Sequence, residues 1–321
     1  MTSTQKRWLL RGAKVGLVVL ILWAVRRTLV AAWSELVEGN GAVAWAFRPG
    51  WLAASGVIYL VGLLPAGIYW HRILRDLGQQ VRLCEALRAY YIGHLGKYVP
   101  GKVTVVVLRV GLIWSARPDG AVAAASVFLE TFTWLACGGV LAAVYLAATH
   151  RTQAVLMWAA IGLAIGLGLP TIPWVFRRVV RLAASRYLSS MGQQGLEGLG
   201  LRTLLAGWAC SGLAWLMLGL SYWTVLRGMG IEAALGELPR YLASVAMATL
   251  TGFVVVFIPG GLGIREAVLA ELMAPHLGGL VGRAALYAVA SAAVLRVVWV
   301  VSELVISGIL YWWGPPTESR P

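Results

Sequence analysis

The sequence predicts an all-α polytopic membrane protein with about six transmembrane helices and two re-entrant helical hairpins in an inverted repeat. The first observation is composition: of 321 residues, 60% are hydrophobic and 12% are charged, and the mean hydropathy is +0.77. That balance excludes an ordinary soluble domain. The second observation is a series of apolar runs long enough to cross a bilayer, which takes about 20 helical residues. The third is a short motif that occurs twice.

The repeated motif places Pro-Gly after an aromatic and a β-branched residue. It reads Y-V-P-G at 98–101 and F-I-P-G at 257–260, an offset of 159 residues that also aligns Gly93 with Gly252. Proline removes an amide donor and glycine permits unusual backbone angles, so each copy is expected to interrupt a helix. An internal repeat is therefore predicted.

The first spanning helix is expected at about 8–26, with its basic N-terminal flank in the cytoplasm. This stretch also resembles a secretory signal peptide, but two arginines follow it at once and no A-x-A cleavage site is evident, which favours a retained helix. The next helix, about 50–70, returns the chain to the cytoplasm. Five basic side chains follow it, as the positive-inside rule requires: His71, Arg72, Arg75, Arg82 and Arg88.

The first Pro-Gly lies in segment 84–117, whose apolar halves are each too short to span the membrane. We expect a re-entrant hairpin entering from the cytoplasmic face, because broken backbone at membrane depth must be covered by protein or reached by water. A third helix, about 119–148, crosses outward, and a fourth, about 153–175, crosses back.

A basic loop at 177–202 is expected in the cytoplasm between the halves. The fifth helix, about 203–226, leads to a second hairpin at 241–274 that enters from outside, and the sixth helix is expected at about 284–312. The predicted units are a first repeat at 1–176, which includes the fourth helix that starts the second half, the basic loop, a second repeat at 203–313 and a cytoplasmic tail at 314–321. Three crossings per half invert the second repeat, as in transporters whose binding site lies near the midplane.

Ionisable residues at membrane depth are costly and are therefore functional candidates. Lys97, Lys102 and Arg109 flank the first Pro-Gly and predict a cationic pocket for a phosphate, assisted by a half-helix N-terminus. The alternative is that they snorkel to the interface. Arg265 and Glu266 are adjacent on a helix and point about 100° apart, so one is expected to face the cavity and the other to pair elsewhere. Their alternative role is a salt bridge that only fixes the hairpin.

Glu130 is expected near mid-bilayer, and Arg296 and Glu303 lie two turns apart on one face of the sixth helix. Pairing of Arg296 with Glu130, or of Arg265 with Glu303, stays open at this point. Instead of pairing with arginines, the carboxylates could take up and release protons as a proton relay.

The sequence lacks the motifs that are typical of several classes of enzyme. The sequence has no ATP-binding loop, no dinucleotide-binding loop and no serine-hydrolase motif. Four scattered histidines and three distant cysteines predict no metal site and no disulfide. The net charge of +14 lies in clusters between apolar runs, which favours membrane orientation over nucleic-acid binding. We therefore expect no enzyme activity, no catalytic residues and no cofactor.

The motifs resemble the lysylphosphatidylglycerol synthase transmembrane-domain family, also called flippase-like or YbhN-like proteins. The resemblance covers nearly the whole chain, and the P-G-G-L-G-x-R-E element is its most specific part. The residues and motifs that match the family are R-x-Y-Y-I-G-H-L-G-K-Y-V-P-G-K at 88–102, Arg109, Glu130, I-P-G-G-L-G-I-R-E-A at 258–267, Arg296 and Glu303. The resemblance implies a stand-alone lipid translocator without the synthase domain. Related members serve lipid-linked sugar pathways, so the cargo stays open.

The expected function is movement of an anionic phospholipid, such as aminoacylated phosphatidylglycerol, or of a polyprenyl-phosphate lipid across the bacterial inner membrane, with both termini cytoplasmic. Binding is assigned to Lys97, Lys102, Arg109, Arg265 and Arg296. Charge balance and gating are assigned to Glu130, Glu266, Glu303, Pro100, Gly101, Pro259, Gly260 and Gly261. Two rival classes are a non-transporting subunit that anchors or regulates a glycosyltransferase or lipid synthase, and a membrane enzyme acting on a lipid phosphate. A glycosyltransferase, a lipid synthase or a second copy of the chain is a candidate partner, and nucleic acid is not.

Overall fold

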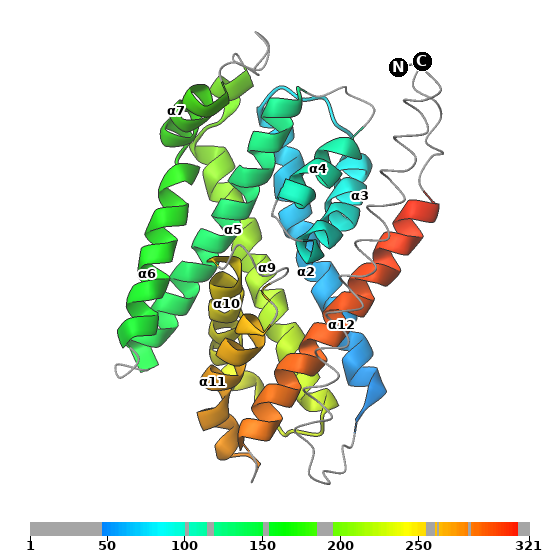
Figure 1. The fold of residues 1–321 in the computed structure, drawn as a ribbon, viewed down its shortest axis with the longest axis vertical. Helices are drawn as coiled ribbons and strands as arrows, with labels where there is room; N and C mark the ends of the chain where they lie inside the picture. Colours follow the sequence, from blue (N-terminus) through cyan, green and yellow to red (C-terminus); the bar gives the residue numbers. More distant parts are fainter. Residues whose placement is uncertain are drawn as a thin grey trace.

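The computed structural model describes residues 47–99, 103–113, 119–149, 154–184, 195–254, 261, 263–281 and 284–313, and all regular structure in them is helical. Within these residues, four helices are long and apolar enough to cross a membrane, or five if one bent pair of helices counts as a single span. The four are α2 (Pro49–Asp76), α5 (Gly120–Thr149), α9 (Leu201–Gly228) and α12 (Ala284–Trp312). A multi-pass helical membrane protein is thus confirmed (Figure 1).

These four helices match the spans predicted at 50–70, 119–148, 203–226 and 284–312. Hydropathy locates them well because each is a long apolar run. The helix predicted at 8–26 and the tail predicted at 314–321 lie outside the described residues.

The fourth predicted helix is interrupted. Helix α6 (Ala154–Gly168) is followed by the short helix η2 (Leu169–Thr171) and by α7 (Pro173–Ala184), and the two longer pieces are bent by 74°. Pro170 and Pro173 each lack a backbone N–H, which explains the break. A single helix to residue 175 is therefore a wrong prediction.

The loop predicted at 177–202 is also wrong in its first part, because 177–184 belongs to α7. The spacing of its apolar side chains explains the helix: Phe176 and Val180, one turn apart, are 4% and 7% exposed, while Arg178 and Leu182 are exposed. Helix α7 is thus an amphipathic basic helix packed on the end of the bundle. After the undescribed residues, the chain returns through η3 (Leu196–Gly198).

Two further segments are broken helical pairs at the predicted positions. The first comprises α3 (Leu83–His94), η1 (Leu95–Tyr98) and α4 (Val103–Gly111). The second comprises α10 (Leu238–Val254) and α11 (Ile264–Gly278), after the short helix η4 (Leu235–Glu237). Helices α3 and α4 lie in the upper half of Figure 1, and α10 and α11 lie in the lower half.

The interruption of both helices is confirmed, although four of the residues predicted to cause it (Pro100, Gly101, Pro259 and Gly260) lie outside the described residues. The described part of the second break contains Gly261 at φ 67° and Gly263 at φ 79°. These are left-handed backbone angles that favour glycine. Backbone geometry therefore explains Gly261 and Gly263, and at Gly261 a Cβ would in addition lie 2.8 Å from the Cα of Gly252.

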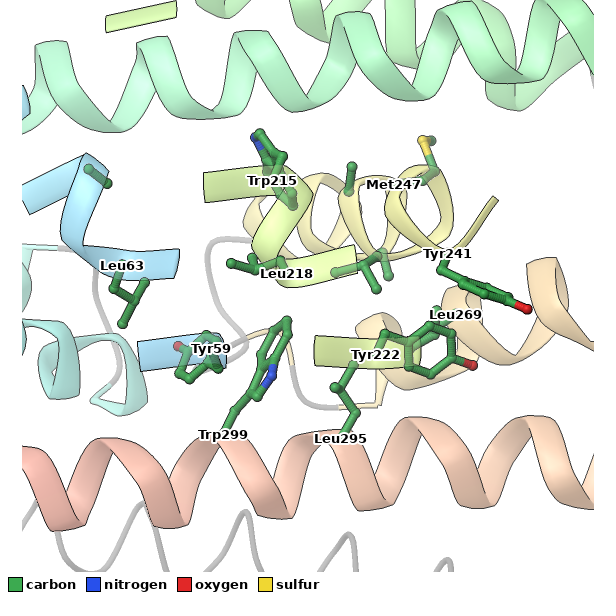
Figure 2. Close-up of a cluster of buried hydrophobic side chains, with 14 of the residues drawn as sticks. Tyr59, Leu63, Trp215, Leu218, Tyr222, Tyr241, Met247, Leu269, Leu295 and Trp299 are labelled. Atoms are coloured by element: carbon green, nitrogen blue, oxygen red, sulfur yellow. The ribbon is translucent and has the colours of Figure 1, made fainter. Parts of the chain in front are cut away.

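The centre of the bundle is the long contact between α2 and α9. Small residues let the helices approach closely: a Cβ at Gly62 would lie 2.7 Å from the Cβ of Met217. Buried aromatic and aliphatic side chains fill the space around this contact, among them Tyr59, Trp215 and Trp299 (Figure 2). Helices α3 and α12 pack on α2, while α5 and α10 pack on α9, so each broken pair lies against the central contact.

Candidate functional site

Three ion pairs connect the broken pairs to the long helices. Arg109 Nη1 lies 2.7 Å from Glu130 Oε2, Arg296 Nη1 lies 3.2 Å from Glu266 Oε1, and Lys97 Nζ lies 2.5 Å from Glu303 Oε1. Neither pairing considered from the sequence, Arg296 with Glu130 or Arg265 with Glu303, forms. The sequence could not decide between partners because the two members of each ion pair lie on different elements.

The pair between Arg109 and Glu130 joins α4 to α5. Arg109 and Glu130 are each 3% exposed. Tyr90 donates a hydrogen bond of 3.1 Å to Glu130 Oε1, and its ring lies 3.9 Å from the guanidinium carbon. The stem of Arg109 crosses Gly93, where a Cβ would lie only 2.5 Å from Arg109 Cγ. The charge of Arg109, expected to capture a phosphate, is therefore balanced within the protein.

Glu266 has two partners at the start of α11. Its Oε2 accepts a 2.8 Å hydrogen bond from the backbone N–H of Gly263, while Oε1 faces Arg296 on α12. One carboxylate thus caps a helix and balances a buried arginine, as expected at a helix N-terminus. The expectation that one member of the Arg265 and Glu266 dipeptide pairs elsewhere is confirmed for Glu266.

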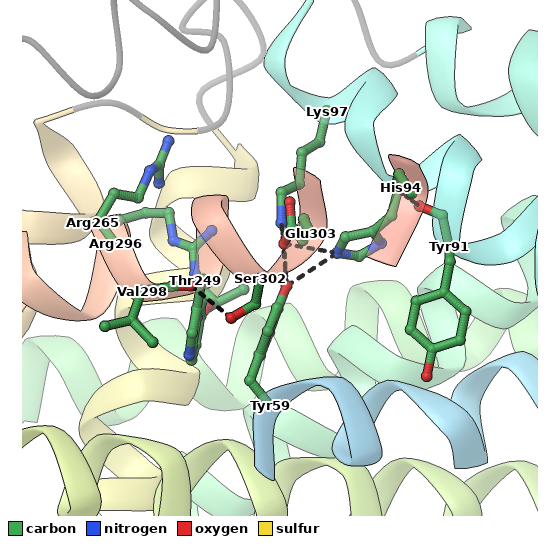
Figure 3. Close-up of polar contacts among 12 residues, drawn as sticks. Tyr59, Tyr91, His94, Lys97, Thr249, Arg265, Arg296, Val298, Ser302 and Glu303 are labelled. Carbon is green, nitrogen blue, oxygen red and sulfur yellow. Dashed lines mark hydrogen bonds and ion pairs between the residues drawn. The ribbon is translucent and has the colours of Figure 1, made fainter. Parts of the chain in front are cut away.

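Glu303 collects donors from three elements (Figure 3). Its Oε1 accepts hydrogen bonds from Lys97 of η1 and from the Tyr59 hydroxyl of α2, and His94 Nε2 of α3 lies 3.8 Å away. Tyr59 also stacks on Trp299, with ring centroids 4.5 Å apart. The sequence reasoning missed Tyr59, whose one signal is a hydroxyl in the middle of an apolar span, and it assigned no role to His94.

Arg265 differs from the other cations of the site. Among the described residues, no carboxylate lies within 4.0 Å of it; its Nη2 donates a 3.0 Å hydrogen bond to Thr249 Oγ1. Its guanidinium carbon lies 5.7 Å from the centre of the Trp299 ring, and its stem crosses Gly252, where a Cβ would lie 2.3 Å from Arg265 Cγ. Arg265 is thus held in place without an ion-pair partner in the part of the chain that the structure describes.

A small pocket opens beside Arg265. It has a volume of about 20 Å³, and Glu266, Arg296 and Trp299 also line it. A pocket of that size holds about one water molecule. Two arginines, Arg265 and Arg296, thus line one small space.

Helix α12 brings the two broken pairs together. Arg296 and Glu303 lie on one face of it, the first bound to Glu266 of the second pair and the second bound to Lys97 of the first pair. Arg296 also lies 5.6 Å from the centre of the Tyr98 ring. Lys97 and Glu266, which are far apart in the sequence, are thus both bound to side chains of α12.

The described members of this charged cluster have a surplus of positive charge. Four cations (Lys97, Arg109, Arg265 and Arg296) face three carboxylates (Glu130, Glu266 and Glu303). Such a cluster in a low-dielectric region attracts an anion strongly. The described residues contain no group of three His, Cys, Asp or Glu side chains arranged to hold a metal. Lys102 lies outside them.

Comparison with known proteins supports the resemblance that the motifs carry. A family model described as the lysylphosphatidylglycerol synthase TM region matches residues 9–306. A search of curated proteins finds no match. The family match includes both broken pairs and all seven charged residues of the cluster.

Proposed function

Because the chain belongs to the lysylphosphatidylglycerol synthase transmembrane family, which indicates a membrane protein of lipid metabolism or transport, we propose that it moves an anionic lipid between leaflets. The cargo class is a phospholipid such as aminoacylated phosphatidylglycerol, or a polyprenyl-phosphate lipid. Both carry a phosphate at the membrane surface and chains that stay in the apolar layer. The lipid crosses unchanged, so the proposed activity is translocation rather than catalysis.

The proposed architecture is an inverted repeat of six spans and two re-entrant hairpins in the inner membrane, with cytoplasmic termini. Two observations support it. The order long helix, broken pair, long helix occurs as α2 to α5 and again as α9 to α12. The two broken pairs also lie in opposite halves of the bundle (Figure 1), as inversion requires.

The proposal rests on one observation. The guanidinium of Arg265 lines a pocket, and it has no carboxylate partner among the described residues. An uncompensated charge at membrane depth is expensive, which favours a role in binding. Arg265 and Arg296 together offer planar forks that suit phosphate oxygens. One phosphodiester would supply the single negative charge that the described cluster lacks.

Movement of the lipid would require exchange of partners on α12. In the proposed cycle, Lys97 meets the phosphate from the cytoplasmic side, and Arg265 with Arg296 receives it in the second half. Glu303 and Glu266 balance the cations when no lipid is bound. The two broken pairs would alternate in exposing the site, each anchored to α12 by its ion pair.

The test is leaflet exchange in proteoliposomes that carry head-group-labelled phosphatidylglycerol or a polyprenyl phosphate. Arg265→Gln is compared with Arg202→Gln, because Arg202 is an exposed arginine outside the cluster. We expect exchange in the wild type and in Arg202→Gln, and at least a tenfold slower rate in Arg265→Gln at matched folding. The recovered lipid should have an unchanged mass.

Wild-type rates equal to those of empty liposomes for both lipids would contradict translocation. Equal rates in the wild type and in Arg265→Gln would remove Arg265 from the path. A changed lipid mass would instead indicate an enzyme. Labelling of single cysteines placed in 177–184 and in η4, from either side of sealed vesicles, checks the proposed orientation.

A further inference from the structure

The carboxylate of Glu303 is asymmetric in its contacts. The residue is 1% exposed, and both Lys97 and Tyr59 donate to its Oε1. Among the described residues, no donor reaches the buried Oε2. An ionised carboxylate in an apolar interior is costly unless its charge is paired and its oxygens accept hydrogen bonds. The ionised form of Glu303 therefore depends on Lys97.

Lys97 is the more accessible member of this pair. Its side chain is 22% exposed, whereas that of Glu303 is 1% exposed. Within the described part of the chain, it is the one lysine or arginine within 4.0 Å of Glu303. An anion that approaches from outside can thus compete for Lys97 without reaching Glu303. Loss of Lys97 would leave a buried, uncompensated carboxylate, and such a group takes up a proton instead of staying charged.

We propose that Glu303 is a proton-binding site whose occupation is linked to binding of the lipid phosphate. The inference rests on the proposed function and deepens it. In the linked step, the hydrogen bond from Lys97 Nζ to Glu303 Oε1 breaks and one from Nζ to a phosphate oxygen forms. A proton from water then bonds to Glu303 Oε2, and no oxidant or reductant is needed.

The charges of this step balance. The phosphodiester group brings one negative charge and the proton one positive charge, so for a lipid without an ammonium group, such as phosphatidylglycerol, the loaded protein has the same net charge as the empty one. An electroneutral load avoids moving a net charge through the low-dielectric interior. It would also allow a proton gradient to bias the direction of lipid movement.

Glu303 shares its surroundings with other titratable and charged groups. They are Tyr59 on α2, His94 on α3, Lys97 and Tyr98 on η1, Arg265 on α11 and Arg296 on α12 itself. Of these, histidine is the type that normally titrates near neutral pH. His94 is therefore the competing source of any pH dependence, and it needs its own variant.

The experiment measures binding of short-chain, fluorescently labelled phosphatidylglycerol to the full-length protein in phosphatidylcholine nanodiscs between pH 5.5 and 8.5. The phosphodiester keeps its charge throughout this range, so the slope reports on the protein. Where one proton is taken up per lipid, the dissociation constant should rise about tenfold per pH unit. Glu303→Gln should bind with a dissociation constant that does not change with pH.

Two control variants separate Glu303 from other groups. Glu197→Gln carries the same substitution at a side chain that is 58% exposed, and it should keep the wild-type slope. His94→Gln should also keep it. A flat wild-type profile, a slope that persists in Glu303→Gln, or a slope lost in His94→Gln would each overturn the inference.

Proton uptake by the wild type gives a second readout that needs no variant. In weakly buffered solution with a pH-sensitive dye, saturation with the same lipid above the apparent titration point should take up about one proton per bound lipid. Binding without uptake would refute the inference and leave the proposed function intact. Absence of lipid binding at every pH would refute the proposed function itself.

Discussion

The two broken pairs use the same local construction around an arginine. In the first pair, the stem of Arg109 crosses Gly93, and in the second the stem of Arg265 crosses Gly252. At either glycine a Cβ would lie within 2.5 Å of the arginine Cγ. Glycine at these positions therefore makes room for a cation between two packed half-helices.

The two arginines differ in what surrounds their charge. Arg109 is 3% exposed and faces Glu130 on α5, the long helix that follows its pair. Arg265 instead shares its pocket with Arg296 on α12, the long helix that follows its own pair, and Arg296 holds the nearby Glu266. A repeated backbone arrangement thus holds one arginine that is paired with a carboxylate and one that is not paired among the described residues, and we propose that the second binds an anion.

The largest effect on stability is expected from Glu130→Ala. This change leaves Arg109 buried and uncompensated, which should lower the free energy of unfolding by about 3–5 kcal/mol. Unfolding in mixed detergent micelles titrated with SDS, followed by circular dichroism, measures it. Arg109→Met combined with Glu130→Leu should recover most of the loss, because the charge and its partner are then removed together. A loss below about 1 kcal/mol in Glu130→Ala would contradict the structural role of the pair.

The two glycines provide a matched pair of smaller changes. Gly93→Ala forces Arg109 away from Glu130 and also brings a Cβ 3.3 Å from the backbone nitrogen of Arg109. Such overpacking typically costs about 1–3 kcal/mol of unfolding free energy. Gly252→Ala displaces an arginine that has no ion pair with any described residue, so it should cost less stability while slowing lipid exchange. The same unfolding titration and the proteoliposome assay compare the two variants.

Equal stability losses and equal exchange rates in the two alanine variants would remove the distinction between the broken pairs. Exchange slowed only in Gly93→Ala would reverse it, and the anion site would then belong to the first pair.

The helical spans and the broken pairs could be predicted from the sequence because both follow from local signals. Apolar length locates a span, and Pro-Gly marks an interruption. The partners of the charges could not be predicted. Glu303 alone has contacts with Tyr59, His94 and Lys97, all of which lie far from it in the sequence, and Tyr59 carries no motif. Helix α7 was missed because its arginines suggested a loop, although Phe176 and Val180 have helical spacing.

Tyr90→Phe tests the hydrogen bond that supports the structural arginine. Removal of the hydroxyl takes one donor from Glu130 but leaves Arg109 paired, so the expected loss is about 1.5 kcal/mol, the lower end for a bond to a charged group. Tyr241→Phe, which loses a bond of 3.2 Å to the backbone oxygen of Ala234 outside the cluster, is the matched control. A loss in Tyr90→Phe that exceeds the loss in Glu130→Ala would show that the Tyr90 hydroxyl, rather than the ion pair, is the main support of this site.

The smallest effect on stability is expected from Arg265→Gln, although this variant should lose most lipid exchange. Two terms oppose each other. The variant loses the hydrogen bond from the charged guanidinium to Thr249, worth about 1.5–3 kcal/mol, but it also removes a largely desolvated charge that has no carboxylate partner among the described residues, which offsets most of that loss. The free energy of unfolding should therefore change by less than about 1 kcal/mol in either direction. A loss similar to that of Glu130→Ala would mean that Arg265 fixes the fold as Arg109 does, and the surplus positive charge would then need another explanation than an anionic ligand.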